Sequence, residues 1–179
     1  MRGVSTSLVR MCGGNPRFGR VMAEHDDLLS EFQSQAKNET SATALMEYMV
    51  ARLHAKLARY NWVGFYLVDS ADPGFLVVGP YVGSFSPNMR IPLDTGLCGA
   101  AARIQKTVIV DDVRQDPRYL AGSSMVISEI VVPILVNQKL AAELDIESYF
   151  PATFNKPEQA FVEACAGIVS KSLANGRSM

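Results

Sequence analysis

The sequence predicts an α+β fold in which terminal helices pack on one face of a central antiparallel sheet. Apolar residues recur at helical spacing near both ends of the 179-residue chain, and short runs rich in β-branched and aromatic residues fill the middle. Hydrophobic residues make up 48% of the chain and charged residues 20%, as in an ordinary globular domain. We therefore expect a flexible tail over residues 1–18 and a single domain over residues 19–179.

The helices are predicted from apolar periodicity and from end signals. Thr40 or Ser41 caps the second helix, and Pro157 suits the first turn of the last one. His25 and His54 are expected on polar, solvated helix faces. The predicted helical ranges are 20–37, 41–59, 96–104 and 157–173.

The strands are predicted from runs of four to eight residues bounded by turn residues. Residues 81–91 are interpreted as a strand that passes into a long loop, and residues 114–124 as a mobile loop. The loops between residues 81 and 129 should lie on the sheet face opposite the helices, so a ligand is expected there. The other predicted strands are 62–68, 75–78, 107–110, 129–135 and 140–147.

Charge and cysteine usage narrow the classes of function. The net charge of -1 gives no electrostatic case for nucleic acid. No apolar run approaches the roughly 18 residues of a spanning helix, so we expect a cytoplasmic protein without a membrane partner. The three cysteines Cys12, Cys98 and Cys165 form no CxxC pair, and only two histidines accompany them. Neither a disulfide framework nor a metal site is predicted, and no cofactor.

Cys98 lies in the first turn of the predicted helix 96–104, after the capping residues Asp94 and Thr95. Unpaired backbone N–H groups in that turn favour anions, so the thiol pKa is expected to be lowered. A helix start does not by itself imply catalysis, and Cys98 is a working thiol, the relic of one, or a packing residue. Cys165, on the apolar face of the last helix, is interpreted as packed.

Two acidic residues in one strand are the second candidate feature. Strand alternation places Asp145 and Glu147 on the same face, and Glu129 opens the adjoining strand and could reach the same space. Buried carboxylates require a cationic or hydrogen-bond-donating partner, which a ligand ammonium group would supply. The alternative is that both acids face solvent on a half-exposed strand.

Trp62 and Tyr66 are four residues apart in a predicted strand and share a face, with Phe65 on the other side. They could wall a small apolar pocket, although aromatic residues at this spacing are more often part of a core.

Five motifs resemble, in order and spacing, those of the GAF-domain free methionine-(R)-sulfoxide reductases. The resemblance implies a GAF fold, usually dimeric, with a small closed pocket for free methionine sulfoxide. It implies that Trp62 and Tyr66 line this pocket and that Glu129, Asp145 and Glu147 hold or polarise the substrate, although the family usually has aspartate where Glu147 stands. The motifs are residues 61–66, 79–83, 96–101, 128–133 and 144–147.

The cysteines depart from the family pattern. Cys98 matches the resolving cysteine, whereas Asn88 and Gly122 stand where the family has its upstream and its nucleophilic cysteine. Sulfoxide reduction by thiols needs a thiolate that attacks sulfur and a second thiol that forms the disulfide. We therefore favour a non-catalytic module that binds free methionine sulfoxide or another amino-acid-like zwitterion.

Two alternatives stay open. The first is an active reductase with Cys98 as nucleophile and Cys12 or an external thiol as the resolving group. The second is a dimerisation unit, a homodimer in which the pocket is vestigial.

Overall fold

The computed structural model describes residues 16–177, and within that range the expected helices are present. The first helix begins at Pro16 rather than near residue 20, and the remainder of the predicted tail lies outside the described residues. The second ends at Lys56, with Leu57 as its C-cap, and Ser41 is its N-cap. The helices are α1 (Pro16–Asn38), α2 (Ala42–Lys56), α3 (Gly96–Ile104), the single 3-10 turn η1 (Val113–Gln115) and α4 (Lys156–Ala174).

The strands form a six-stranded sheet in the order β3-β2-β1-β6-β5-β4, and neighbouring strands are antiparallel. The strand predicted over residues 75–78 is longer than expected, because it continues through Gly79 and Pro80 as far as Gly83. A further short strand forms where a long loop was expected. The strands are β1 (Trp62–Val68), β2 (Phe75–Gly83), β3 (Arg90–Pro92), β4 (Val108–Val110), β5 (Ser128–Val136) and β6 (Lys139–Ser148).

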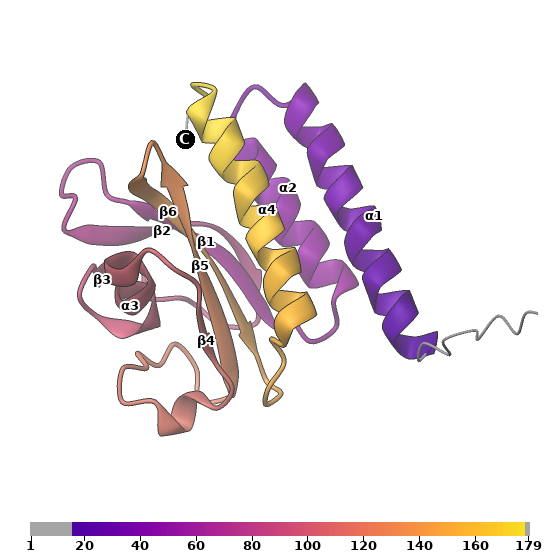
Figure 1. The fold of residues 1–179 in the computed structure, drawn as a ribbon. Coiled ribbons are helices and arrows are strands. Elements are labelled where there is room, and N and C mark those ends of the chain that lie inside the picture. The colour runs from indigo at the N-terminus through magenta and orange to yellow at the C-terminus, as the bar shows by residue number, and fades with distance from the viewer. Residues whose placement is uncertain (1–15, 178–179) are drawn as a thin grey trace, which may run out of the picture.

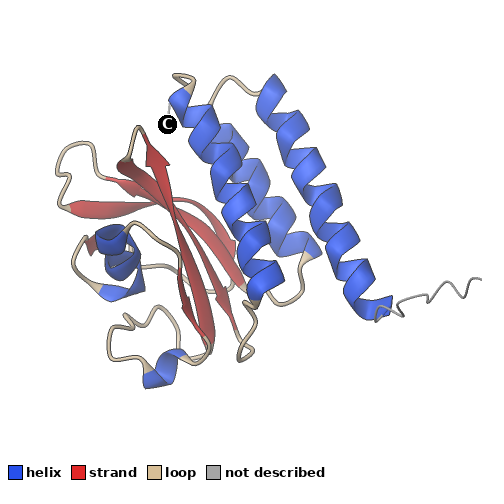
Figure 2. Ribbon diagram, viewed as in Figure 1, coloured by secondary structure: helices blue, strands red, loops and turns tan. Residues whose placement is uncertain are grey.

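The two faces of the sheet are covered differently (Figure 1). Helices α2 and α4 pack on one face, with α1 against their outer side, while α3 and the loops around it cover the other face. The secondary-structure view makes the division clear, with the long helices α1, α2 and α4 on one side of the sheet and α3 and η1 among loops on the other (Figure 2). The predicted α+β fold class, an antiparallel sheet with terminal helices on one face, is confirmed.

Strand alternation divides the sheet residues between two apolar clusters. Phe65 and Leu144 point toward the three long helices, whereas Trp62, Tyr66 and Val131 point toward α3. The predicted sharing of a face by Trp62 and Tyr66, with Phe65 opposite, is therefore confirmed. The second cluster carries the chemistry described below.

The prediction that His25 is solvated is wrong. Its side chain is 2% exposed and stacks on Phe161 of α4, with 4.0 Å between ring centroids. Its Nε2 lies 3.6 Å from Oε2 of Glu158. The imidazole lies on the α1 face that packs against α4, together with Leu28 and Phe32 of the same core.

Helices α1 and α2 are joined by a polar contact at their surface. The Arg52 guanidinium donates to both carboxylate oxygens of Glu31, at 2.5 and 2.8 Å, and the Tyr48 hydroxyl donates to the same carboxylate. This bidentate geometry lowers the pKa of Glu31 to about 2.

No helix within residues 16–177 is long and apolar enough to cross a membrane.

Candidate functional site

A cavity of about 20 Å³ lies between the sheet and the elements on its α3 side. Five of the six predicted site residues line it: Tyr66 of β1, Cys98 of α3, Glu129 of β5, and Asp145 and Glu147 of β6. Residues far apart in the sequence are thus brought to one place by the sheet order and by α3. A larger surface groove between α4 and β5, of about 570 Å³, contains none of the predicted site residues.

The acidic residues of β6 are buried because the strand turns one face toward α3. Glu143, Asp145 and Glu147 alternate along the strand and are between 0% and 7% exposed. Glu129 is buried as well and lies opposite Glu147 in the β5–β6 register. The alternative in which Asp145 and Glu147 face solvent is therefore wrong.

Glu143 was not among the predicted site residues. The strand alternation that places Asp145 and Glu147 on one face also places Glu143, two residues earlier, on that face, so the sequence pattern could have predicted it.

The buried carboxylates lack partners for several of their oxygens. Oε2 of Glu129, Oδ1 of Asp145, Oε2 of Glu147 and both oxygens of Glu143 have no hydrogen bond among the described residues. The described residues that line the cavity include no lysine, arginine or histidine. The site therefore concentrates hydrogen-bond acceptors that a donor or a cation would satisfy.

Burial is the main cause that raises the pKa of each of these acids. The pKa of Glu143 rises to about 8, and that of Asp145 to about 8 through burial and the neighbouring Glu143. The pKa values of Glu129 and Glu147 are raised well above their ordinary value, with the negative charge of Asp145 adding to the effect of burial. At neutral pH, in the absence of a ligand, the carboxyl groups are therefore held mainly in their protonated form.

Cys98 lies in the first turn of α3, as predicted, but its thiol is not activated there. The Sγ atom donates to Oδ2 of Asp145 over 3.7 Å, and burial followed by the charge of Asp145 raises the thiol pKa well above its ordinary value. The expectation of a lowered pKa is wrong. The effect of the helix N-terminus is outweighed by desolvation and by carboxylates that β5 and β6 bring to the sulfur.

Trp62 lies beside the cavity rather than in its lining. Its indole covers Gly64 and Gly83, where a Cβ atom would approach ring atoms to 2.2 Å, so these two glycines make room for the ring. The ring stacks on Tyr81 and Phe85 and lies 6.2 Å from the Tyr66 ring, centroid to centroid. Trp62 thus supports the wall to which Tyr66 belongs.

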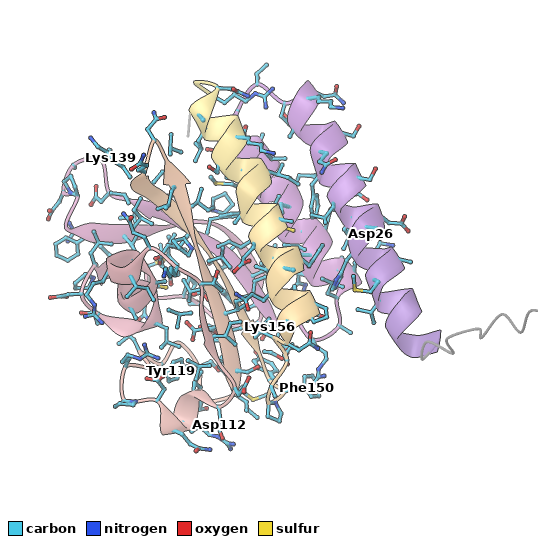
Figure 3. All side chains as sticks on the ribbon, viewed as in Figure 1. Asp26, Asp112, Tyr119, Lys139, Phe150 and Lys156 are labelled. Carbon is cyan, nitrogen blue, oxygen red and sulfur yellow. The ribbon has the colours of Figure 1, made fainter. Side chains whose placement is uncertain are left out.

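The loops close the site from outside. The Tyr66 hydroxyl donates to the backbone carbonyl of Asn88 over 3.0 Å, and Leu120 lines the cavity above Gly96. Gly122 packs against Phe85, where an added Cβ atom would approach the ring to 3.0 Å. In Figure 3, Tyr119 and Asp112 mark this loop region, on the side of the sheet away from α4.

Three potential metal-ligating groups meet at the cavity. The Cys98 sulfur, a Glu129 oxygen and an Asp145 oxygen lie within 4.8 Å of one another, and all three residues are buried. No sequence spacing indicated this cluster, because each residue comes from a different element.

Comparison with known proteins agrees with this architecture. The GAF domain family model matches residues 43–173. The chain is 30% identical to the free methionine-R-sulfoxide reductase of Escherichia coli over 148 residues, which cover 83% of this chain and 87% of that protein. It is 33% identical to protein YtsP of Bacillus subtilis over 147 residues, which cover 82% of this chain and 89% of that one.

Among solved structures, the free methionine-R-sulfoxide reductase from Neisseria meningitidis in complex with its substrate superposes with a TM-score of 0.81. The two chains are 32% identical, and the match covers 87% of this chain and 93% of that one. The fold and the family model together define the class of protein as a GAF domain. Within this class, the chain belongs to the free methionine-(R)-sulfoxide reductase family.

Proposed function

We propose that this chain is a ligand-binding GAF domain that takes a small amino-acid-like zwitterion and does not carry out the thiol cycle of the reductases. The observation that carries the proposal is the set of buried carboxylates with unpartnered oxygens around one cavity whose described lining holds no cationic side chain. An ammonium group provides three donors and a positive charge, which is what such acceptors need.

The choice of a zwitterion rests on the relatives. The proteins from E. coli and N. meningitidis are named for free methionine-R-sulfoxide, a free amino acid derivative with an ammonium group. In this proposal the ligand ammonium group donates hydrogen bonds to Asp145 and Glu147, and the apolar part of the ligand packs against Tyr66 and the neighbouring Trp62. Glu147 has one methylene more than the aspartate usual in the family, so a ligand smaller than methionine sulfoxide is favoured.

The absence of a thiol cycle is inferred from three positions. Asn88 and Gly122 replace two cysteines of the family pattern, and Gly122 has no side chain. The remaining Cys98 is buried, and its raised pKa keeps it as a thiol at neutral pH. A thiol in this state is a poor nucleophile toward sulfur. These observations count against the alternative in which Cys98 attacks the sulfoxide.

Binding requires movement of the loops. A cavity of about 20 Å³ accommodates roughly one water-sized species, whereas pockets that enclose ligands are typically of about 300 Å³ or more. The ligand therefore enters by displacing Leu120 and the segment that carries it.

A thermal-shift screen of free amino acids and their oxides tests the binding function. A ligand at 100 times its dissociation constant should stabilise the fold by about 2.7 kcal/mol. Asp145→Asn should abolish that shift, whereas Glu47→Gln, on the exposed face of α2, should preserve it. No stabilisation by any compound would favour the dimerisation unit with a vestigial pocket instead.

Turnover distinguishes the reductase alternative. With free methionine-(R)-sulfoxide and a dithiol reductant, the wild-type chain should form no methionine. The double substitution Asn88→Cys and Gly122→Cys restores the missing thiols and should create activity, since Phe85 needs to yield only slightly at residue 122. Steady turnover by the wild-type chain that disappears in Cys98→Ser would overturn the proposal.

A homodimer and a cytoplasmic location stay predictions. Light scattering at several protein concentrations checks the first, and cell fractionation checks the second.

A further inference from the structure

We propose that Cys98, Glu129 and Asp145 form a binding site for a zinc-type divalent metal ion. The proposal goes beyond the binding of a zwitterion and does not depend on it. It concerns the inner end of the same cavity, where α3 meets strands β5 and β6.

The spacing of the ligand atoms is close to that of a coordination sphere. Tetrahedral zinc with a Zn–S distance of about 2.3 Å and a Zn–O distance of about 2.0 Å places sulfur and oxygen roughly 3.5 Å apart. The Sγ of Cys98 and Oδ2 of Asp145 are 3.7 Å apart. All three ligand atoms lie within 4.8 Å of one another, so small side-chain movements would bring them to the separations of a coordination sphere.

Unpartnered buried oxygens provide an independent indication of a ligand. Glu129 and Asp145 are more than nine-tenths buried, line the cavity, and each has a carboxylate oxygen without a hydrogen bond among the described residues. Glu147 lies opposite Glu129 in the β5–β6 register and also has one oxygen without a hydrogen bond among the described residues, but it is not part of the three-residue cluster. A metal ion would supply the partner that these carboxylate oxygens lack and would balance their charge once they ionise.

The donor set indicates the class of metal. One thiolate with carboxylate oxygens suits zinc, whereas magnesium and calcium prefer oxygen ligands alone. A cavity of about 20 Å³ admits an ion or one water molecule without rearrangement of the loops. On metal binding, the thiol and the carboxyl groups release their protons to solvent, and the ion supplies the positive charge that balances the resulting thiolate and carboxylates.

The ion and a ligand ammonium group would compete, because both use the Asp145 carboxylate. Metal-loaded protein should therefore bind amino acids more weakly than metal-free protein. The two proposals can be tested separately, because metal binding can be measured without amino acids and amino-acid binding can be measured in metal-free protein.

Cobalt titration tests the site directly. We would titrate Co²⁺ into the full chain carrying Cys12→Ser, so that the tail thiol does not contribute, after treatment with a chelator. The expected result is one Co²⁺ per chain with a sulfur-to-cobalt charge-transfer band in the near ultraviolet, which Zn²⁺ removes by displacement. The band reports a bond to sulfur, which a purely structural role of Cys98 would not produce.

Variants assign the ligands. Cys98→Ser should abolish the band, and Glu129→Gln and Asp145→Asn should weaken binding by more than the roughly 10- to 100-fold typical of outer-shell partners. Cys165→Ala removes the other buried cysteine and should leave the titration unchanged. Circular dichroism of each variant confirms that the fold is intact.

Three outcomes would overturn the proposal: no binding of Co²⁺ or Zn²⁺ by the metal-free chain, binding without the band, or a band that survives in Cys98→Ser. An amino-acid thermal shift in chelator-treated protein is independent of these outcomes and tests only the zwitterion proposal.

Discussion

Glu143 should make the ligand-free protein less stable as the pH rises. Its carboxyl group is fully buried on the α3 side of β6, and burial raises its pKa from 4.5 to about 8. Between these two values the folded chain holds a proton that the unfolded chain has released. The free energy of unfolding therefore falls with increasing pH across this window.

The magnitude follows from the two pKa values. The full difference corresponds to about 5 kcal/mol, and the part lost between pH 5 and pH 7 is about 2.5 kcal/mol. Glu143→Gln keeps the shape of the side chain but cannot ionise. Relative to the wild-type protein, the variant should thus gain about 2.5 kcal/mol on going from pH 5 to pH 7.

Urea unfolding measures this difference. Trp62 is the single tryptophan and is 1% exposed, so its fluorescence reports the loss of the fold. The protein is kept metal-free with a chelator, and the control is Glu47→Gln on the exposed face of α2, which keeps Glu143 and should therefore follow the pH dependence of the wild-type protein. A stability difference between Glu143→Gln and wild type that stays constant within about 0.5 kcal/mol would refute the reasoning.

Two further predictions concern packing and surface charge. Gly64→Ala places a Cβ atom 2.2 Å from the Trp62 ring and should destabilise the fold by about 1–3 kcal/mol. Gly167→Ala on α4 has open space around it and should be neutral or stabilising by up to about 1 kcal/mol. Equal changes in the free energy of unfolding, measured by chemical denaturation, would contradict the packing argument. Arg52→Met removes the ion-pair partner of Glu31 and should lower stability by up to about 1 kcal/mol at neutral pH. This loss should shrink as the pH falls from 4.5 toward 2, because the Glu31 carboxylate of the wild-type chain becomes protonated over this range. A loss that stays constant over this range would show that Arg52 acts through packing alone.

Much of the fold could be predicted because its signals are local. Helical periodicity located the long helices, and strand alternation placed Asp145 and Glu147 on one face. The same alternation extended by one step would have included Glu143. The predicted end of the second strand was wrong because Gly79 and Pro80 look like a turn, whereas they lie at an irregularity of the β1–β2 pairing, between paired residues Val78 and Tyr81, and β2 continues through them.

The state of the site residues could not be predicted from local rules. The effect of a helix start on a thiol pKa can be outweighed by burial and by nearby carboxylates, and the carboxylates around Cys98 come from strands about 30 and 47 residues further along the chain. His25 illustrates the same point, since only the packing of α1 on α4 brings Phe161 to its ring. Both outcomes depend on tertiary contacts that periodicity does not encode.

The position of Leu120 over Gly96 has a kinetic consequence. Any ligand larger than a water molecule has to wait until this side chain and its loop move aside, because the cavity beneath is about 20 Å³. Association then follows a first-order opening step, so its observed rate should level off as ligand concentration increases and stay below the usual range for preformed pockets. Replacing Leu120 by a smaller residue would speed entry and exit together, and residence time rather than affinity would be the property that this side chain controls.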